Sequence, residues 1–212
     1  MNKPTAARQP RWRDAKFGGC VSARIEQVAP DDTRVMSTEA LLDYPARLTD
    51  RVEHWAARAP ERTVVARRGA DGAWQTVSYR QMLARVRALG QALVDRGLGA
   101  DRPVAILSGN SIEHFTLALA CQWVGVPHTP VSPAYALQSG DFGKLRHILA
   151  RLEPGLVFAD DADRFARAID KAVGDQVEVM SMTGSAGRAL TSYADLLQTV
   201  PGAIGCGRPT MR

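Results

Sequence analysis

The sequence predicts an α/β fold: a parallel, doubly wound sheet with flanking helices. Short apolar runs of strand length, such as residues 104–107, alternate with longer segments whose apolar residues recur at helical spacing, such as residues 78–97. A continuous apolar run is typical of a parallel strand that is covered on both faces. Strands that alternate with helices are joined by right-handed crossovers, which place helices on both sides of the sheet.

The first regular elements are predicted after residue 44. Pro45 suits a first helical turn, and apolar residues follow it at helical spacing up to the break at Pro60. Residues 63–67 and 74–77 have the composition of two short strands, joined by a glycine-rich turn. In residues 1–44 only a short strand near residues 21–28 is indicated.

The clearest helix covers residues 78–97. Ser78 is followed three residues later by Gln81, which is the pattern of a capping box. One face of the segment is apolar and the other is polar. Gly97 then stands where a helix commonly ends on glycine.

Predicted strands and helices continue to alternate after the strand at residues 104–107. We expect Asn110 to cap a largely apolar helix that ends at Gly125. A strand over 126–131 and a loop over 132–141 come next. The remaining predicted elements are a helix over 144–152, a strand over 156–159, a helix capped by Asp160, a strand over 177–180 and a short helix over 193–197.

Composition indicates an ordinary globular protein. The 212 residues are 45% hydrophobic and 23% charged, and no stretch approaches the roughly 18 apolar residues of a membrane span. Residues 1–10 lack the apolar run of a secretory signal. The cysteines at 20, 121 and 206 are scattered, which excludes a disulfide framework and fits a reducing cytoplasmic location.

The net charge of +5 does not by itself indicate a nucleic-acid partner. Arginines are interleaved with acids along predicted helix faces, and only Arg8, Arg11 and Arg13 cluster locally. We therefore expect no nucleic-acid and no membrane partner. A basic balance also suits anionic small molecules, although the charge pattern locates no site for them.

Two segments deserve comparison with anion-binding loops. Residues 108–111 join a predicted strand to a predicted helix, a usual place for ligands in an open α/β sheet. Residues 183–188 are small apart from Arg188 and could bring backbone amides close to a phosphate. Neither segment contains a dinucleotide or P-loop fingerprint, so we favour a polar turn for the first and a simple connection for the second.

The sequence contains no recognisable catalytic or metal-binding pattern. The histidines at 54, 114, 128 and 147 lie in separate segments without ligand spacing. No nucleophile elbow or Ser-His-Asp arrangement is present. Tyr79, Trp123 and Tyr135 are expected to pack in the core. We therefore assign no catalytic, cofactor-binding or metal-binding residue.

Several stretches resemble the start of adenylate-forming acyl-CoA synthetases. These are VSY at 77–79, VAILSGNS at 104–111 and WVGVPHTPVSP at 123–133, although Arg80-Gln81-Met82 departs from the usual continuation of the first motif. Five further stretches resemble feruloyl-CoA synthetases: YPARLTDR at 44–51, EHWAARAP at 53–60, SIEH at 111–114, VSPAY at 131–135 and DFGKLRHI at 141–148. The resemblance covers about residues 40–180.

The resemblance implies a two-step ligase reaction on small-molecule substrates. ATP and Mg²⁺ would activate a hydroxycinnamate as an acyl-adenylate, and the thiol of CoA would then displace AMP. The family's phosphate loop ending in lysine, its Tyr-Gly-x-Thr-Glu and Thr-Gly-Asp stretches and its C-terminal lysine do not occur here. No site for ATP, Mg²⁺ or CoA is therefore recognisable in this chain.

The predicted organisation has three parts. Residues 1–44 form a partly ordered N-terminal extension, residues 45–182 form the α/β portion of the ligase's N-terminal domain, and residues 183–212 form a truncated, irregular tail. Residues 201–212 are rich in glycine and arginine and lack periodicity, which suggests a frameshift or premature stop near residue 200. A fragment of this kind would expose an edge strand and apolar surface, and would be prone to aggregate.

Two hypotheses of different classes follow. The first is an N-terminal ligase fragment that is inactive alone. The second is a non-catalytic binding or scaffold module derived from an AMP-binding ligase. A cooperative melting transition would favour the module.

Overall fold

A computed structural model describes residues 22–202 of the chain. The chain divides into two compact units, Met1–Tyr44 and Pro45–Arg212, which are considered separately. In the part that the structure describes, no helix is long and apolar enough to cross a membrane.

The first unit contains an antiparallel hairpin of β1 (Ala23–Ala29) and β2 (Asp32–Ser37). Ile25 lies opposite Val35, and both side chains are exposed. The sequence indicated one strand here and missed the second, because the two strands lack a buried face that would produce a clear alternation of apolar and polar residues.

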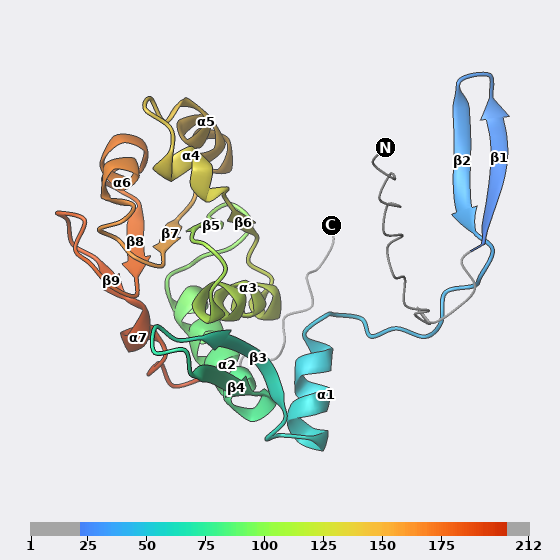
Figure 1. The fold of residues 1–212 in the computed structure, drawn as a ribbon, viewed down its shortest axis with the longest axis horizontal. Coiled ribbons are helices and arrows are strands. Elements are labelled where there is room, and N and C mark those ends of the chain that lie inside the picture. Colours follow the sequence, from blue (N-terminus) through green and yellow to red (C-terminus); the bar gives the residue numbers. More distant parts are fainter. Residues whose placement is uncertain (1–21, 203–212) are drawn as a thin grey trace, which may run out of the picture. The chain divides into compact units, whose positions relative to one another are not determined.

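The second unit is built on a five-stranded parallel sheet (Figure 1). Its spatial order is β6-β5-β7-β8-β9, and every neighbouring pair is parallel. The strands are β5 (Val104–Leu107), β6 (His128–Pro130), β7 (Leu156–Ala159), β8 (Glu178–Ser181) and β9 (Thr191–Ser192). Strands that pair in parallel need long crossover connections, and helices supply them between β5, β6, β7 and β8. The loop 182–190 connects β8 to β9.

Helices cover both faces of this sheet, which confirms the doubly wound fold. One face packs against α2 (Tyr79–Asp95), α3 (Ile112–Val124) and α7 (Tyr193–Leu196). The other packs against α4 (Pro133–Leu137), α5 (Gly143–Leu152) and α6 (Ala166–Ala172). Alternation along β5 fits this: Ile106 points into the first core and Leu107 into the second.

A smaller apolar cluster extends the core beyond α3. It joins α1 (Asp50–Arg58) and the antiparallel pair β3 (Thr63–Arg68) and β4 (Trp74–Ser78) to the outer faces of α2 and α3. Val52, Met82 and Trp123 are buried in this cluster. The packing role predicted for Trp123 is thereby confirmed.

Helix ends test the capping predictions. Ser78 and Gln81 form the complete capping box of α2, as predicted. Gly97 and Gly125 adopt left-handed φ values of 62° and 77°, which glycine tolerates best at a helix end. The residue that caps α3 is Ser111, whose hydroxyl accepts from the N–H of His114, so the assignment to Asn110 was wrong.

Two other helix starts differ from expectation. α1 begins at Asp50 and not at Pro45, since the residues between them form turns and Leu48 is exposed. Asp160 does not cap α6, which begins at Ala166 without a side-chain cap. The carboxylate of Asp160 is instead bound to the turn after β5.

The segment 183–212 was predicted to be an irregular tail apart from a short helix over 193–197, and its described part contains a strand as well as that helix. β9 extends the sheet next to β8, and α7 follows directly from it. Tyr193 is only 2% exposed and packs against Phe158 of β7, with ring centroids 5.5 Å apart. Residues 203–212, on which the rest of that prediction falls, lie outside the described residues.

Candidate functional site

The strand order has a topological switch point between β5 and β7. From β5 the chain moves outward to β6 and then crosses back over β5 to β7. Open α/β sheets bind ligands in the crevice outside the carboxyl ends of the strands at such a point. Ser108 and Gly109 follow β5 here, and Asp160 follows β7.

The carboxylate of Asp160 fills this crevice. Its Oδ2 lies 3.1 Å from the hydroxyl of Ser108 and accepts from the backbone N–H of Gly109 at 3.2 Å. Its Oδ1 is buried and has no hydrogen-bond partner within residues 22–202. The N–H of Gly109 is thus bound by the carboxylate of Asp160, and the other oxygen of that carboxylate, Oδ1, is left as a buried acceptor.

The start of α3 is also occupied by groups of the chain itself. Ser111 binds the N–H of His114 at 3.0 Å, and the Nδ1 of His114 lies 3.1 Å from the carbonyl oxygen of Gly109. Glu113 adds a carboxylate to the first turn, where it pairs with Arg67 at 3.1 Å. These contacts support a structural turn at residues 108–111 rather than an anion site.

The small-residue loop after β8 has an internal anion of its own. Asp163 Oδ1 accepts from the N–H groups of Ser185 at 2.8 Å and Ala186 at 2.9 Å. These bonds hold the pKa of Asp163 below the ordinary carboxyl range. Arg188 turns away from the loop and donates to the carbonyl oxygens of Asp175 and Val177. The loop is therefore a connection tied down by Asp163, as the absence of a phosphate fingerprint suggested.

Sequence reasoning missed both aspartates as anchors. The one available signal was the cluster of aspartates at 160, 161 and 163, directly after the apolar run of β7. Nothing in the spacing connects Asp163 to Ser185, which is 22 residues away along the chain. Only the parallel pairing of β7 with β8 brings the two loops together at one edge.

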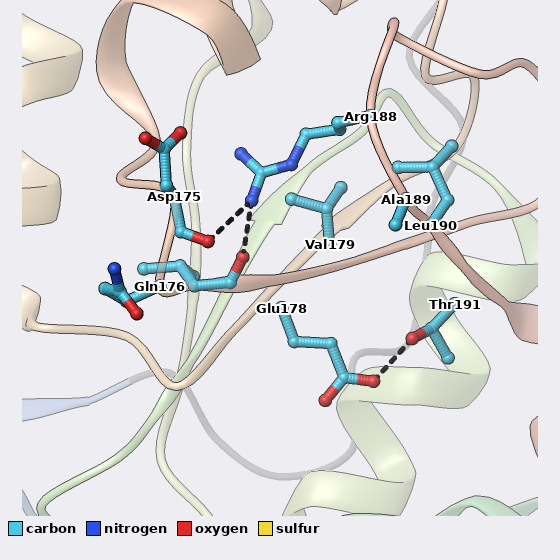
Figure 2. Close-up of a pocket in the computed structure, with 9 residues that line it drawn as sticks. Asp175, Gln176, Glu178, Val179, Arg188, Ala189, Leu190 and Thr191 are labelled. Atoms are coloured by element: carbon cyan, nitrogen blue, oxygen red, sulfur yellow. Dashed lines mark hydrogen bonds between the residues drawn. The ribbon is translucent and has the colours of Figure 1, made fainter.

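A pocket of about 520 Å³ opens at β8 and β9, at the amino end of β8 (Figure 2). Figure 2 shows Arg188 directed at the carbonyl group of Asp175, to which it donates at 3.2 Å. Arg188 also donates to the carbonyl oxygen of Val177 at 3.0 Å. Glu178 accepts from the hydroxyl of Thr191 at 2.5 Å and pairs with Arg96 at 3.0 Å. Arg188 and Glu178 are thus both bound to other groups of the chain. Their contacts hold the edge strand β9 and the loop before it against β8.

Metal-binding and nucleophilic groups do not converge in the described part of the chain. No group of three or more His, Cys, Asp or Glu side chains in residues 22–202 is placed to hold a metal. Cys121 is buried in the core on α3, and burial raises the pKa of its thiol to about 12. A thiol with this pKa is protonated at neutral pH and is not a nucleophile.

Comparison with known proteins gives the family. A model of AMP-binding enzymes matches residues 52–200, more than half of the chain. Acetyl-coenzyme A synthetase of Burkholderia mallei is 34% identical over 86 residues, which cover 41% of this chain and 13% of that protein. Bacitracin synthase 3 of Bacillus licheniformis is 34% identical over 93 residues, or 43% of this chain and 1% of that protein.

A solved structure shares the fold. The A domain of carboxylic acid reductase from Segniliparus rugosus superposes with a TM-score of 0.58 at 17% identity, covering 74% of this chain and 31% of that one. The chain thus spans only a small part of the length of these relatives. With a family match over residues 52–200 and the parallel sheet described above, the chain belongs to the AMP-binding enzyme family of adenylate-forming ligases.

Proposed function

We propose that this chain is the N-terminal α/β portion of an acid–CoA ligase of the feruloyl-CoA synthetase type. In the complete enzyme the carboxylate of a hydroxycinnamate would attack the α-phosphorus of ATP, with Mg²⁺, and release pyrophosphate. The thiol of CoA would then attack the carbonyl carbon of the acyl-adenylate and displace AMP. The likeness to acetyl-coenzyme A synthetase supports the acid–thiol class of reaction.

The position of the feruloyl-CoA synthetase-like stretches carries this proposal. Two of the five follow the carboxyl ends of parallel strands: 111–114 begins α3 after β5, and 131–135 follows β6. A third, 141–148, begins α5 after the short helix α4. Ligands of open α/β sheets bind at this edge. Two of the stretches that resemble feruloyl-CoA synthetases therefore lie on the side where a substrate would bind.

This chain's contribution is structural in the proposal. Asp160 and Asp163 fix the loops at the carboxyl edge, and Glu178 fixes the edge strand β9. We assign no residue of this chain to catalysis or to binding of ATP, Mg²⁺ or CoA. The 212 residues alone are expected to form no thioester.

Genomic sequence provides the first test. We would sequence the DNA beyond codon 212 and translate all three frames. A Ser/Thr/Gly-rich loop that ends in lysine, in the same or a shifted frame, is the expected result. Its absence from every frame would contradict the ligase proposal and leave an independent module.

A second candidate function is a non-catalytic binding or scaffold module. The observation that favours it is that carboxylates of the chain itself bind the loop N–H groups at the carboxyl edge of the sheet. Asp160 binds the N–H of Gly109, and Asp163 binds those of Ser185 and Ala186. A module should unfold in one cooperative transition and remain monodisperse, whereas a ligase fragment should aggregate. Formation of a thioester from ferulate, ATP and CoA by the isolated chain would contradict the module and the expected inactivity of the 212 residues alone.

A further inference from the structure

A surface groove runs between α5 and α6. Three of its lining residues, Asp141, Phe142 and Arg146, belong to the stretch 141–148 that resembles feruloyl-CoA synthetases, but the proposed function assigns them no role. Two hollows lie along it. One has a volume of about 450 Å³ and lies near the C-terminal ends of the two helices, and the other has a volume of about 340 Å³ and lies near the start of α5. Arg146 lines both hollows, so its side chain lies between them.

The larger hollow is apolar and reaches the core. Its lining includes Leu149 of α5, Val157 of the central strand β7 and Val173 at the end of α6, all of which are buried. Ala150 and Glu153 stand exposed at its rim. Hollows of this volume, lined mainly by apolar side chains with a few polar groups, are typical sites for small molecules.

The smaller hollow is lined by charged side chains, and some of its basic residues form salt bridges while others do not. Lys171 is bound to Asp170 at 2.9 Å. Asp141 accepts from the N–H of Gly143 at 3.1 Å and from Ser139 in its own loop, and its charge also interacts with that of Arg146 from beyond salt-bridge distance. Arg146 and Arg167 have no carboxylate within salt-bridge distance among residues 22–202; Arg167 lies over the ring of Phe142, 5.8 Å from its centre.

Both ends of α5 adopt a backbone conformation that costs energy. Phe142 before the helix and Glu153 after it have φ values of 54° and 48°, in the left-handed region that glycine prefers. Phe142 lines the charged hollow and Glu153 the apolar one. Non-glycine residues in this region cluster at ligand sites, where the surrounding structure retains the strain.

We propose that this groove binds a small amphiphilic monocarboxylate. The apolar body lies in the hollow over Val157, and the carboxylate binds the guanidinium of Arg146 between the two hollows. The planar fork of arginine matches a carboxylate in two parallel hydrogen bonds. A single charge fits best, since Asp141 and Asp170 beside the site would repel a dianion.

Binding of three probes with the same chain length tests the proposal on the full 212-residue chain. Octanoate, octan-1-ol and octyltrimethylammonium share a body of roughly eight carbons, which suits a pocket of this class. Calorimetric titration should show octanoate binding at least about tenfold more tightly than octan-1-ol, the ratio expected for a charge-assisted hydrogen bond. The ammonium probe should bind more weakly still.

Substitutions on the surface of α5 locate the site. Arg146→Gln should weaken octanoate binding about tenfold or more, and Ala150→Phe should abolish it by filling the apolar hollow. Arg151→Gln removes the same charge from an exposed position of the same helix that lines neither hollow, and should bind like the wild type. Far-UV circular dichroism verifies that each variant is folded.

Three results would overturn the proposal. They are no saturable binding of octanoate, equal affinity for octanoate and octan-1-ol, or equal losses in Arg146→Gln and Arg151→Gln. The outcome is independent of the ligase proposal, because none of these measurements involves ATP, CoA or thioester formation.

Discussion

The carboxylate of Asp163 lies 2.8 Å from the backbone nitrogen of Ser185 and occupies the amide cradle of the loop after β8. The same oxygen accepts from the next N–H group, that of Ala186, at 2.9 Å. Successive N–H groups in such a loop form a concavity that binds anions. An external phosphate would have to displace this internal carboxylate. The small residues of the loop are therefore not sufficient evidence of a phosphate site.

Replacing Asp163 with alanine should free this loop. The N–H groups of Ser185 and Ala186 would lose their acceptor, and their hydrogen exchange should accelerate about tenfold or more if the bond governs protection. Amide exchange followed by NMR measures this. Asp175→Ala is the matched control, because Asp175 contributes only its backbone carbonyl to this region. Equal exchange rates in the two variants would show that the carboxylate does not hold the loop.

The same contact predicts a pH dependence. Hydrogen bonds from Ser185 and Ala186 lower the pKa of Asp163 in the folded chain. A lowered folded-state pKa adds stability that is present above the unfolded value of about 3.9 and is lost as the pH falls through the folded value. Amide shifts of Ser185 should therefore titrate with a midpoint below about 3.9, and should not titrate in Asp163→Ala. A midpoint above that value would contradict the assignment.

Asp160 should be more important for stability than its place in a loop suggests. Its Oδ2 binds Ser108, which is only 4% exposed, and the N–H of Gly109. Asp160→Ala would leave the N–H of Gly109 without its acceptor, while the hydroxyl of Ser108 could still donate to the carbonyl oxygen of Gly109 at 2.8 Å. The substitution should lower the free energy of unfolding by about 1–3 kcal/mol. Asp160→Asn keeps an acceptor oxygen and should lose less. Urea denaturation distinguishes the two variants, and equal losses would argue against the hydrogen bonds as the cause.

Sequence reasoning was most successful where the local signal was strong. The strands Val104–Leu107 and Leu156–Ala159 have the predicted bounds, because a strand buried on both faces is a continuous apolar run bounded by turn residues. The helix with the capping box was also correct, since its cap bonds residues three positions apart. In both cases the deciding interactions lie within a few residues.

Predictions failed where contacts between residues far apart in the sequence determine the local structure. α4 was predicted to be a loop, because five residues are too few to show a helical period. The two residues of β9 form a strand only by pairing with β8. Asp160 was assigned to a helix cap, but its carboxylate bonds to residues 51 and 52 positions earlier in the chain. The anchoring contacts at the carboxyl edge were therefore inaccessible to any local pattern.

Tyr193 tests whether the chain after β8 belongs to the fold. Its ring is 2% exposed and contacts Phe158. Its hydroxyl is hydrogen-bonded to the side chain of Thr116 and lies 3.4 Å from the carbonyl oxygen of Glu113. Tyr193→Ala should lower the free energy of unfolding by about 3–5 kcal/mol, whereas Tyr193→Phe should cost about 1 kcal/mol or less. Val200→Ala, at a side chain that is 83% exposed, should change it by no more than about 0.5 kcal/mol. Urea denaturation of the three variants measures these differences. If Tyr193→Ala were no more destabilising than Val200→Ala, α7 would not be packed on the sheet, and the segment after β8 would be the irregular tail that the sequence predicted.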